Sequence, residues 1–433
     1  GDFAPVVAAL RPTPAEAPET GLLLNREFRA PHLRQRRADD RFSLHVPHDY
    51  RPDQPRGLVL FLHGGGRKTP RDAGAAVFES YRIADLLTSS GFMVAAPAAP
   101  FHPGSYNGWN LPEADELVMD VIEELEHAYA IDPDRVFIAG TSMGGIGVNH
   151  LAHRLGDRFA GVLAAASAWD IAYWPCLHGS QVWITQGVND TTLFRRRHGT
   201  DIEFTRLMRQ RLEQAGVACH YREHSGGHSI ASARFALREW LTWAQTARRD
   251  PFHPRVVALT PRGLTPWMDW RRYPVPVVSV QASYDFHELA PSPHARWVSI
   301  EGVGDETVLY DRVVTTPCRD EVEDDWDEFR LELRRKHIRA GLVEAFLVGD
   351  NTIELTPRNV TALTLWLHPA MVDLDRVRVI VNGLERHHGP VRPSLATLLE
   401  SYLRRRDWGL LYPARLTIEN DGTWETPNQI SGQ

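Results

Sequence analysis

One short segment of the chain has the residue types and the spacing of a serine nucleophile. Residues 136–145 read Val-Phe-Ile-Ala-Gly-Thr-Ser-Met-Gly-Gly, so an apolar strand runs into G-x-S-x-G and then into a helix. A serine on such a sharp turn is held clear of the sheet, at the positive end of the helix, and small neighbours relieve crowding. The G-x-S-x-G motif alone is weak evidence for a nucleophile. Here it has the strand before it and the helix after it that a nucleophile turn requires. We therefore predict that Ser142 is the nucleophile of an acyl-transfer site.

Such a serine needs two partners further along the chain. A hydroxyl is a poor nucleophile at neutral pH, so a base must take its proton and an acid must fix the tautomer of that base. Asp190 and His228 each follow a predicted strand, where functional groups of open α/β sheets gather. The order Ser142, Asp190, His228 is the order that this architecture uses. Asp170 stays open as the alternative acid and His224 as the alternative base.

A glycine-rich turn supplies candidate donors for the developing oxyanion. Backbone N–H groups are the usual device for stabilising negative charge on an attacked carbonyl oxygen. The sequence His-Gly-Gly-Gly at 63–66 directly follows a solid apolar run at 58–62. We expect the donors to be the N–H of Gly65 and that of Met143, the residue after the nucleophile. His63 is expected to pack or hydrogen-bond within the turn and not to react.

Strands and helices alternate along the part of the chain that carries these residues. This alternation predicts an α/β fold with a mostly parallel, doubly wound sheet covered on both faces. The expected strands are 42–46, 58–62, 92–96, 136–139, 162–166, 182–185 and 217–221, and the expected helices are 113–130, 146–155, 204–215 and 237–244. We assign 41–250 to this catalytic domain. Residues 1–40, rich in Pro, Ala and Arg without a sustained period, are expected to form an extended arm.

The pattern changes to short β-rich segments after residue 250. Strands are expected at 256–259, 277–280, 353–355, 363–367 and 377–381, and Asn382-Gly383 is a strong hairpin signal. Residues 251–433 therefore form, by expectation, a smaller, mainly β, sandwich-like domain. Its acidic cluster at 320–328 lacks the glycine of a calcium loop and is interpreted as a solvated face.

The sequence favours a site without metal or cofactor. Three cysteines without C-x-x-C spacing indicate neither a disulfide framework nor a thiolate zinc site. His220, His224 and His228 have the four-residue spacing of ligands on a helix, but the Ser-Gly-Gly that precedes His228 breaks any helix there.

Two tryptophans are candidates for substrate contact. Trp109 lies just before the helix expected at 113–130, and Trp169 follows the strand expected at 162–166. Either indole could stack on an aromatic acyl group or a polyester unit. Packing within the core or a loop is the competing interpretation for each.

Composition limits the partners. The 433 residues carry a formal net charge of −7, which gives no electrostatic footprint for nucleic acid. No window approaches the length of a membrane span. The start at Gly1 without methionine indicates a trimmed chain, either by a signal peptidase or in preparation. A secreted or periplasmic location is the corresponding expectation, and the oligomeric state is left open.

Three stretches together resemble the α/β-hydrolase superfamily, in particular its feruloyl esterases and polyhydroxybutyrate depolymerase-like enzymes. They are 58–66, 131–145 and the pair Gly187–Asp190 with Gly226-Gly227-His228. The resemblance covers residues 40 to 248 and implies a metal-free serine esterase that acts through an acyl-enzyme on aryl or polyester-type esters. Gln186 departs from the pattern, because such enzymes often have His there. The segment 351–383 looks like a β-rich tail of some bacterial hydrolases.

Two other functions remain open at this level. The same three residues could cleave amides, as in peptidases of the prolyl-oligopeptidase type, although such peptidases usually place a large β domain before the hydrolase domain. Alternatively, residues 251–433 bind a polymer or a partner and the hydrolase part is auxiliary.

Overall fold

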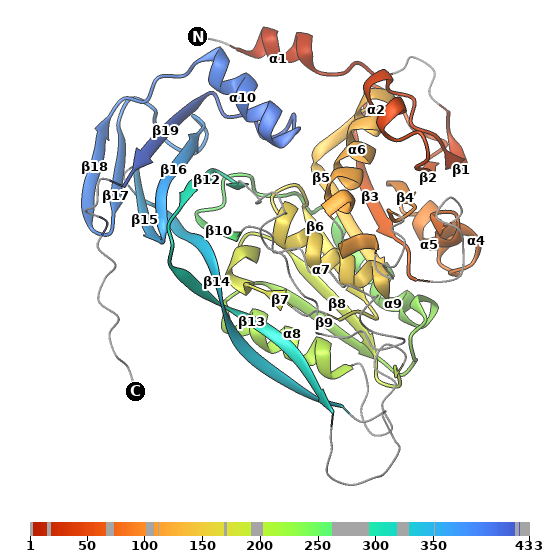
Figure 1. The fold of residues 1–433 in the computed structure, drawn as a ribbon. Coiled ribbons are helices and arrows are strands. Elements are labelled where there is room, and N and C mark those ends of the chain that lie inside the picture. Colours follow the sequence, from red (N-terminus) through yellow and green to blue (C-terminus); the bar gives the residue numbers. More distant parts are fainter. Residues whose placement is uncertain are drawn as a thin grey trace.

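The computed structural model describes residues 3–14, 19–65, 73–100, 108–110, 112–168, 171–191, 202–261, 294–317, 329–349, 351–420 and 424 (Figure 1). A large sheet with helices on both faces carries the chemistry-bearing residues, and a β-rich part lies beside it. Within these ranges, no helix is long and apolar enough to cross a membrane.

The large sheet has eight strands in the order β1-β2-β4-β3-β5-β6-β8-β9. The first two pairings are antiparallel and those from β4 to β9 are parallel. The strands are β1 (Gly21–Arg26), β2 (Phe42–Val46), β3 (Arg56–Leu62), β4 (Met93–Pro97), β5 (Ile131–Thr141), β6 (Gly161–Ala165), β8 (Val182–Gly187) and β9 (Cys219–His224). The expected doubly wound α/β sheet is confirmed.

Both faces of this sheet are covered, which is why its central strands are apolar throughout. Along β3, Leu58, Leu60 and Leu62 belong to one buried cluster, and Val59 and Phe61 belong to another on the opposite face. The helices α6 (Pro112–Ala128), α7 (Met143–Leu155) and α8 (Ile202–Gln214) contribute to the first cluster; α4 (Ala76–Glu79), α5 (Ala84–Thr88) and α9 (Arg234–Ala244) contribute to the second. The described residues of this part also contain the 3-10 turns η1 (Gly108–Asn110), η2 (Trp174–Leu177) and η3 (Ile230–Ala233).

The N-terminal segment is more structured than the extended arm that the sequence favoured. It contains α1 (Ala4–Leu10), the edge strand β1 and α2 (Pro31–Arg36). Strand β1 pairs with β2, and Leu33 of α2 is fully buried. Arg36 of α2 contacts Asp120 of α6 at 2.5 Å. The local composition did not indicate these elements because their partners lie far along the chain.

Two smaller sheets make up the β-rich part. One has the order β18-β17-β15-β14-β13-β7, with β10 also on β14, and the other has the order β11-β12-β16-β19. A single core that includes Trp297, Trp366 and Tyr412 is built from both. The elements are β7 (Ile171–Ala172), β10 (Arg255–Pro261), β11 (His294–Ala295), β12 (Val298–Val303), β13 (Thr307–Pro317), β14 (Phe329–Val348), β15 (Thr352–Arg358), β16 (Val360–Leu367), β17 (Val377–Val381), β18 (Leu384–Gly389), β19 (Ala414–Glu419) and α10 (Leu395–Arg405).

The predicted hairpin at Asn382-Gly383 is confirmed. It joins β17 to β18, and both residues have positive φ, 48° and 81°. The strand expected at 277–280 and the acidic cluster at 320–328 lie outside the described residues.

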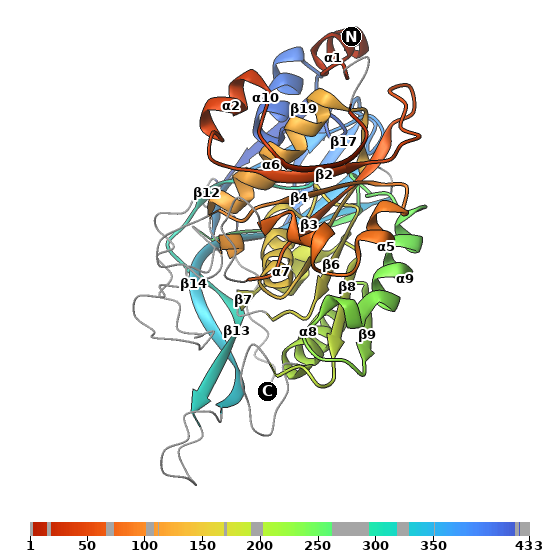
Figure 2. The same cartoon turned by 90° about the vertical axis from the view of Figure 1, so that its right-hand side faces the viewer.

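The two parts of the molecule are in direct contact. The long strands β13 and β14 extend from the β-rich part along the hydrolase part (Figures 1 and 2), and β13 pairs with β7, which follows the loop after β6. The boundaries placed after residues 40 and 250 remain predictions.

Candidate active site

Ser142 lies on a sharp turn between β5 and α7. It has φ 58° and ψ −123° and is the N-cap of the helix, a backbone conformation that L-residues rarely adopt and that occurs at functional sites. The close packing explains the glycines around it. A Cβ on Gly140 would lie 2.4 Å from the carbonyl oxygen of Gly144, and one on Gly144 would lie 2.1 Å from that of Leu62. A Cβ on Gly145 would lie 2.6 Å from the carbonyl oxygen of Ala165.

The structure brings Ser142, His228 and Asp190 together. The Nε2 atom of His228 lies 2.7 Å from Oγ of Ser142, and its Nδ1 atom lies 2.8 Å from Oδ2 of Asp190. The side chain of Asp190 is fully buried, whereas that of His228 is 23% exposed. An imidazole that donates from Nδ1 to a carboxylate can accept the serine proton at Nε2. The arrangement therefore has the geometry for activating Ser142.

Gln186 supports the acid side of this arrangement. It is fully buried at the end of β8, where its Nε2 donates to Oδ2 of Asp190 across 2.8 Å. Its Oε1 accepts the backbone N–H of Ser167 at 3.0 Å, so one amide joins the Asp190 loop to the loop after β6. Sequence reasoning noted Gln186 only as a departure from a family pattern. A polar residue ending a buried strand four positions before the candidate acid was the available signal.

The two alternative residues do not enter this arrangement. Asp170 lies outside the described residues. The Nδ1 atom of His224 accepts a hydrogen bond from the backbone N–H of Gly226, within its own loop. Burial lowers the pKa of His224, and the charge of Asp190 acts in the opposite direction. It is His228 whose imidazole reaches Ser142.

The glycine-rich turn lies directly against the nucleophile. A Cβ on Gly64 would lie 3.3 Å from Cβ of Ser142, so the turn borders the reacting hydroxyl. The N–H of Gly64 donates to the hydroxyl of Tyr81 at 2.7 Å, which leaves the next residue, the solvent-exposed Gly65, as the donor candidate of the turn. Met143 is the first residue of α7, and an N–H in the first turn of a helix has no acceptor within the helix. Met143 thus follows Ser142 directly in the chain, and Gly65 follows the glycine that borders it; their role as oxyanion donors stays a prediction.

His63 is held as a neutral structural residue, in agreement with the expectation that it does not react. Its Nε2 accepts the backbone N–H of Ala99 at 2.9 Å, so its proton is on Nδ1, which lies 2.8 Å from the carbonyl oxygen of Gly64. Burial lowers the pKa of His63 to about 4, and the hydrogen bond to Gly64 acts in the opposite direction.

The expected substrate contact of Trp109 is wrong. Its side chain is 0% exposed, and its Nε1 donates to the carbonyl oxygen of His63 at 3.0 Å. The indole also packs edge-on against the imidazole of His63, with 5.3 Å between the ring centroids. Trp109 therefore supports the glycine-rich turn from inside the core. Trp169, the second candidate, lies outside the described residues.

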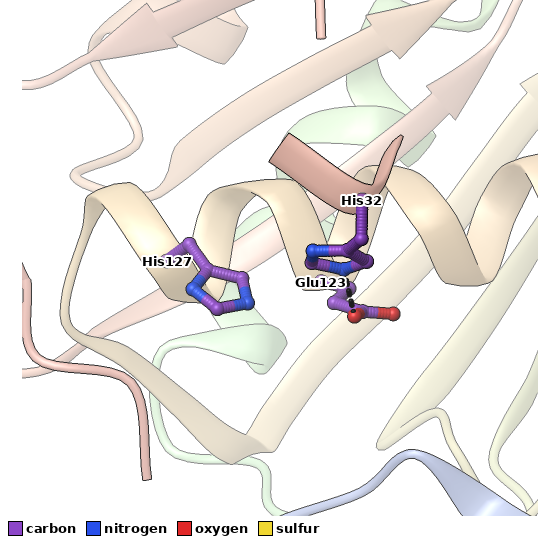
Figure 3. Close-up of side chains that lie close together, drawn as sticks. All are labelled: His32, Glu123 and His127. Carbon is purple, nitrogen blue, oxygen red and sulfur yellow. Dashed lines mark hydrogen bonds and ion pairs between the residues drawn. The ribbon is translucent and has the colours of Figure 1, made fainter. Parts of the chain in front are cut away.

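A cluster with metal-ligand residue types occurs away from this site. Over the described ranges, His32, Glu123 and His127 form the one group of three whose ligand atoms lie within 4.8 Å of one another (Figure 3). His32 Nε2 lies 2.5 Å from Oε1 of Glu123. The other carboxylate oxygen accepts from Nε of Arg406 at 2.8 Å. Because a guanidinium and an imidazole already contact both oxygens, the cluster is better described as a hydrogen-bonded group around the Glu123–Arg406 ion pair that joins α2 and α6 to the end of α10.

Comparison with solved structures yields esterases of low similarity. A thermostable esterase is 24% identical over 48% of this chain and 60% of its own, with a TM-score of 0.39. A ferulic acid esterase is 20% identical over 47% of this chain and 91% of its own, with a TM-score of 0.36. An S-formylglutathione hydrolase from Agrobacterium tumefaciens is 19% identical over 47% of this chain and 88% of its own, with a TM-score of 0.38. The chain thus spans less than two thirds of the first of these proteins.

The family comparison is more extensive. No curated protein matches the chain. The profile described as the alpha/beta hydrolase family matches residues 59–349, more than half of the 433 residues. This range includes Ser142, Asp190 and His228, and it continues through β10 to β14 of the β-rich part. The α/β fold class and the resemblance to the α/β-hydrolase superfamily that were inferred from the sequence are thereby confirmed. The chain belongs to the alpha/beta hydrolase family.

Proposed function

We propose that this protein is a serine carboxylic ester hydrolase that works through Ser142, His228 and Asp190. One observation carries the proposal: His228 lies 2.7 Å from Ser142 on one side and 2.8 Å from the buried Asp190 on the other. The family membership and the strained backbone of Ser142 support it.

The chemistry follows from these contacts. Oγ of Ser142 attacks the carbonyl carbon of the ester as its proton passes to Nε2 of His228, and Asp190 stabilises the resulting imidazolium. The alcohol leaves with that proton, and the acyl group stays on Ser142. Water then gives up a proton to His228 and attacks the acyl carbon, which releases the acid and restores the serine. The N–H groups of Gly65 and Met143 stabilise the negative charge on the carbonyl oxygen in both steps.

We assign aryl or polyester-type esters as the substrate class, on the resemblance of residues 58–66, 131–145 and the two loops to feruloyl esterases and depolymerase-like enzymes. A secreted or periplasmic location accords with such substrates. Peptide amides are the competing class for the same three residues, so an assay must include both.

The test combines covalent labelling with a substrate panel. We expect a fluorophosphonate probe to label Ser142, and Ser142→Ala to abolish hydrolysis of a short acyl nitrophenyl ester while thermal unfolding is unchanged. Asp190→Asn should lower kcat by about 10³- to 10⁴-fold, because the amide favours the wrong imidazole tautomer. Turnover retained by Ser142→Ala, or labelling at another residue, would refute the mechanism. Faster cleavage of peptide amides than of aryl esters would refute the substrate class.

A further inference from the structure

The side chain of Tyr81 reaches the glycine-rich turn beside the nucleophile. Its hydroxyl oxygen lies 2.7 Å from the backbone nitrogen of Gly64 and accepts that N–H. A Cβ built on Gly64 would lie 3.3 Å from Cβ of Ser142 and 3.4 Å from the Tyr81 hydroxyl. The phenol oxygen and the nucleophile therefore border the same small space. No part of the sequence pattern indicated this contact, because Tyr81 lies between α4 and α5, outside every motif.

The hydrogen bond with Gly64 does not use the proton of this phenol, so that proton can be donated to another acceptor. A tyrosine hydroxyl has one proton and can also accept. Since the Gly64 N–H is itself a donor, the phenol can only accept there, and its own proton points elsewhere. Burial raises the pKa of Tyr81, with the bond from Gly64 acting in the opposite direction. The phenol therefore keeps its proton at neutral pH.

The loop that carries Tyr81 is fixed to the segment that carries His228. The next residue, Arg82, has φ 56°, and its carbonyl oxygen accepts from Nη1 of Arg234. The same guanidinium makes two hydrogen bonds to Asp85, of 2.9 and 2.5 Å. Arg234 begins α9, directly after the η3 turn that follows His228. The loop of Tyr81 is thus attached to the first residue of α9, which lies shortly after His228 in the chain.

We propose that the Tyr81 hydroxyl is a side-chain donor of the oxyanion hole, together with the N–H groups of Gly65 and Met143. The inference rests on the proposed ester hydrolysis at Ser142. When Oγ bonds to the carbonyl carbon, the carbonyl oxygen gains the negative charge, and the phenol donates a hydrogen bond to it without transferring its proton. The N–H of Gly64 donates to the phenol oxygen and is not available to the oxyanion. The hydroxyl of Tyr81 donates to the oxyanion instead.

The test compares an ester with its thiono analogue, in which sulfur replaces the carbonyl oxygen. A sulfur anion accepts hydrogen bonds poorly. The kcat/KM of the oxygen ester divided by that of the thiono ester therefore reports hydrogen-bond donation to the oxyanion. We expect Tyr81→Phe to lower kcat for the oxygen ester by about 10²- to 10³-fold, the effect of removing one oxyanion donor, with little change in KM. The ratio should fall by a similar factor.

Tyr50→Phe is the matched control. The hydroxyl of Tyr50 also accepts a backbone N–H at 2.7 Å, from Ala130, away from Ser142. This variant should leave the ratio unchanged. Equal losses for both substrates in Tyr81→Phe would mean that the phenol only shapes the turn, and unchanged kinetics would mean that it does neither; each result overturns the inference. Fluorophosphonate titration of active sites in every variant separates these outcomes from failure of the Ser142 mechanism, in which the wild-type protein would not be labelled at Ser142.

Discussion

Gln186 donates a hydrogen bond to Asp190, with 2.8 Å between Nε2 and Oδ2. The Oδ2 atom that it contacts is also the one that lies 2.8 Å from Nδ1 of His228. Because Gln186 also accepts the N–H of Ser167, its amide cannot turn away from the carboxylate without breaking a second buried bond. The orientation of the candidate acid is therefore set by a residue of the sheet and not by the loop alone.

Replacing Gln186 by Ala should loosen this orientation. A hydrogen bond to a charged group contributes about 1.5–3 kcal/mol, so we expect kcat/KM for a nitrophenyl ester to fall by about 10- to 100-fold. Gln181→Ala removes a similar amide just before the start of the same strand and is the control, with activity expected to stay at the wild-type level. Equal activity of Gln186→Ala and Gln181→Ala would show that Asp190 needs no support from the sheet.

The sequence was most informative where chemistry follows the ends of strands. Motif order and strand position were enough to select Ser142, Asp190 and His228, which lie in hydrogen-bond contact. Those rules are local: each residue follows a strand of one parallel sheet, and the carboxyl ends of such strands meet at one edge.

Residues that act across the fold were not predictable in this way. Tyr81 contacts Gly64 from a loop that has no motif, and Trp109 packs under the glycine-rich turn, although its position before a helix was equally suited to an exposed contact. The same holds for α2, whose Arg36 forms an ion pair with Asp120 of α6, 84 residues further along the chain. Such contacts depend on how separate elements pack, which hydrophobic periodicity does not specify.

Gly144 should be intolerant of any side chain. The Cβ of Gly144→Ala would lie 2.1 Å from the carbonyl oxygen of Leu62 and 2.7 Å from that of His63, both backbone atoms that have little room to move. The nucleophile turn and the glycine-rich turn would be forced apart, and a displacement of about 1 Å at a reacting group can cost 10²-fold in rate. We expect a loss of about that size in kcat per folded molecule. Gly349→Ala, which adds its methyl to open space, should be fully active; an active Gly144→Ala would contradict the packing argument.

A buried ion pair joins the hydrolase part to the β-rich part. Arg249, whose side chain is 0% exposed, contacts Asp407 through Nη1 at 2.5 Å and Nη2 at 3.0 Å. Burial alone would raise the pKa of Asp407, but the charges of Arg158 and Arg249 hold it well below its ordinary range. Arg249→Met leaves the carboxylate of Asp407 buried beside a more distant cation, Nη1 of Arg158 at 3.6 Å, so the variant should lower the free energy of unfolding by about 3–5 kcal/mol.

The adjacent Arg248 provides the control for that experiment. Its side chain is 53% exposed and pairs with Asp132 at 2.8 Å on the surface, where such pairs contribute about 0–1 kcal/mol. Urea unfolding of Arg248→Ala and Arg249→Met should therefore differ by several kcal/mol. Similar unfolding free energies would contradict the assignment of Arg249 as a main ionic link between the two parts.

Acid should destabilise the protein through buried neutral histidines. Burial lowers the pKa of His63 from 6.5 to about 4, and burial is also the main cause of pKa values of about 4 for His153, His178 and His294. Above pH 6.5 neither the folded nor the unfolded form binds a proton at such a group, so its effect on stability is nil. Between pH 6.5 and 4 the unfolded chain binds the proton and the folded chain does not, so the free energy of unfolding falls as the pH falls. Below about pH 4 both forms bind it, and the loss from that group is complete.

The contribution of His63 to this loss of stability in acid can be measured separately. With these pKa values, one histidine should cost about 2 kcal/mol of stability between pH 7.5 and pH 5. His63→Gln removes the titrating ring, and its side-chain carbonyl can still accept the N–H of Ala99 that His63 Nε2 accepts at 2.9 Å. Although this variant should be less stable at pH 7.5, its unfolding free energy in urea should decline by about 2 kcal/mol less than that of the wild type on going to pH 5. An identical decline would mean that His63 is protonated in the folded protein at pH 5, which its acceptance of the Ala99 N–H does not allow.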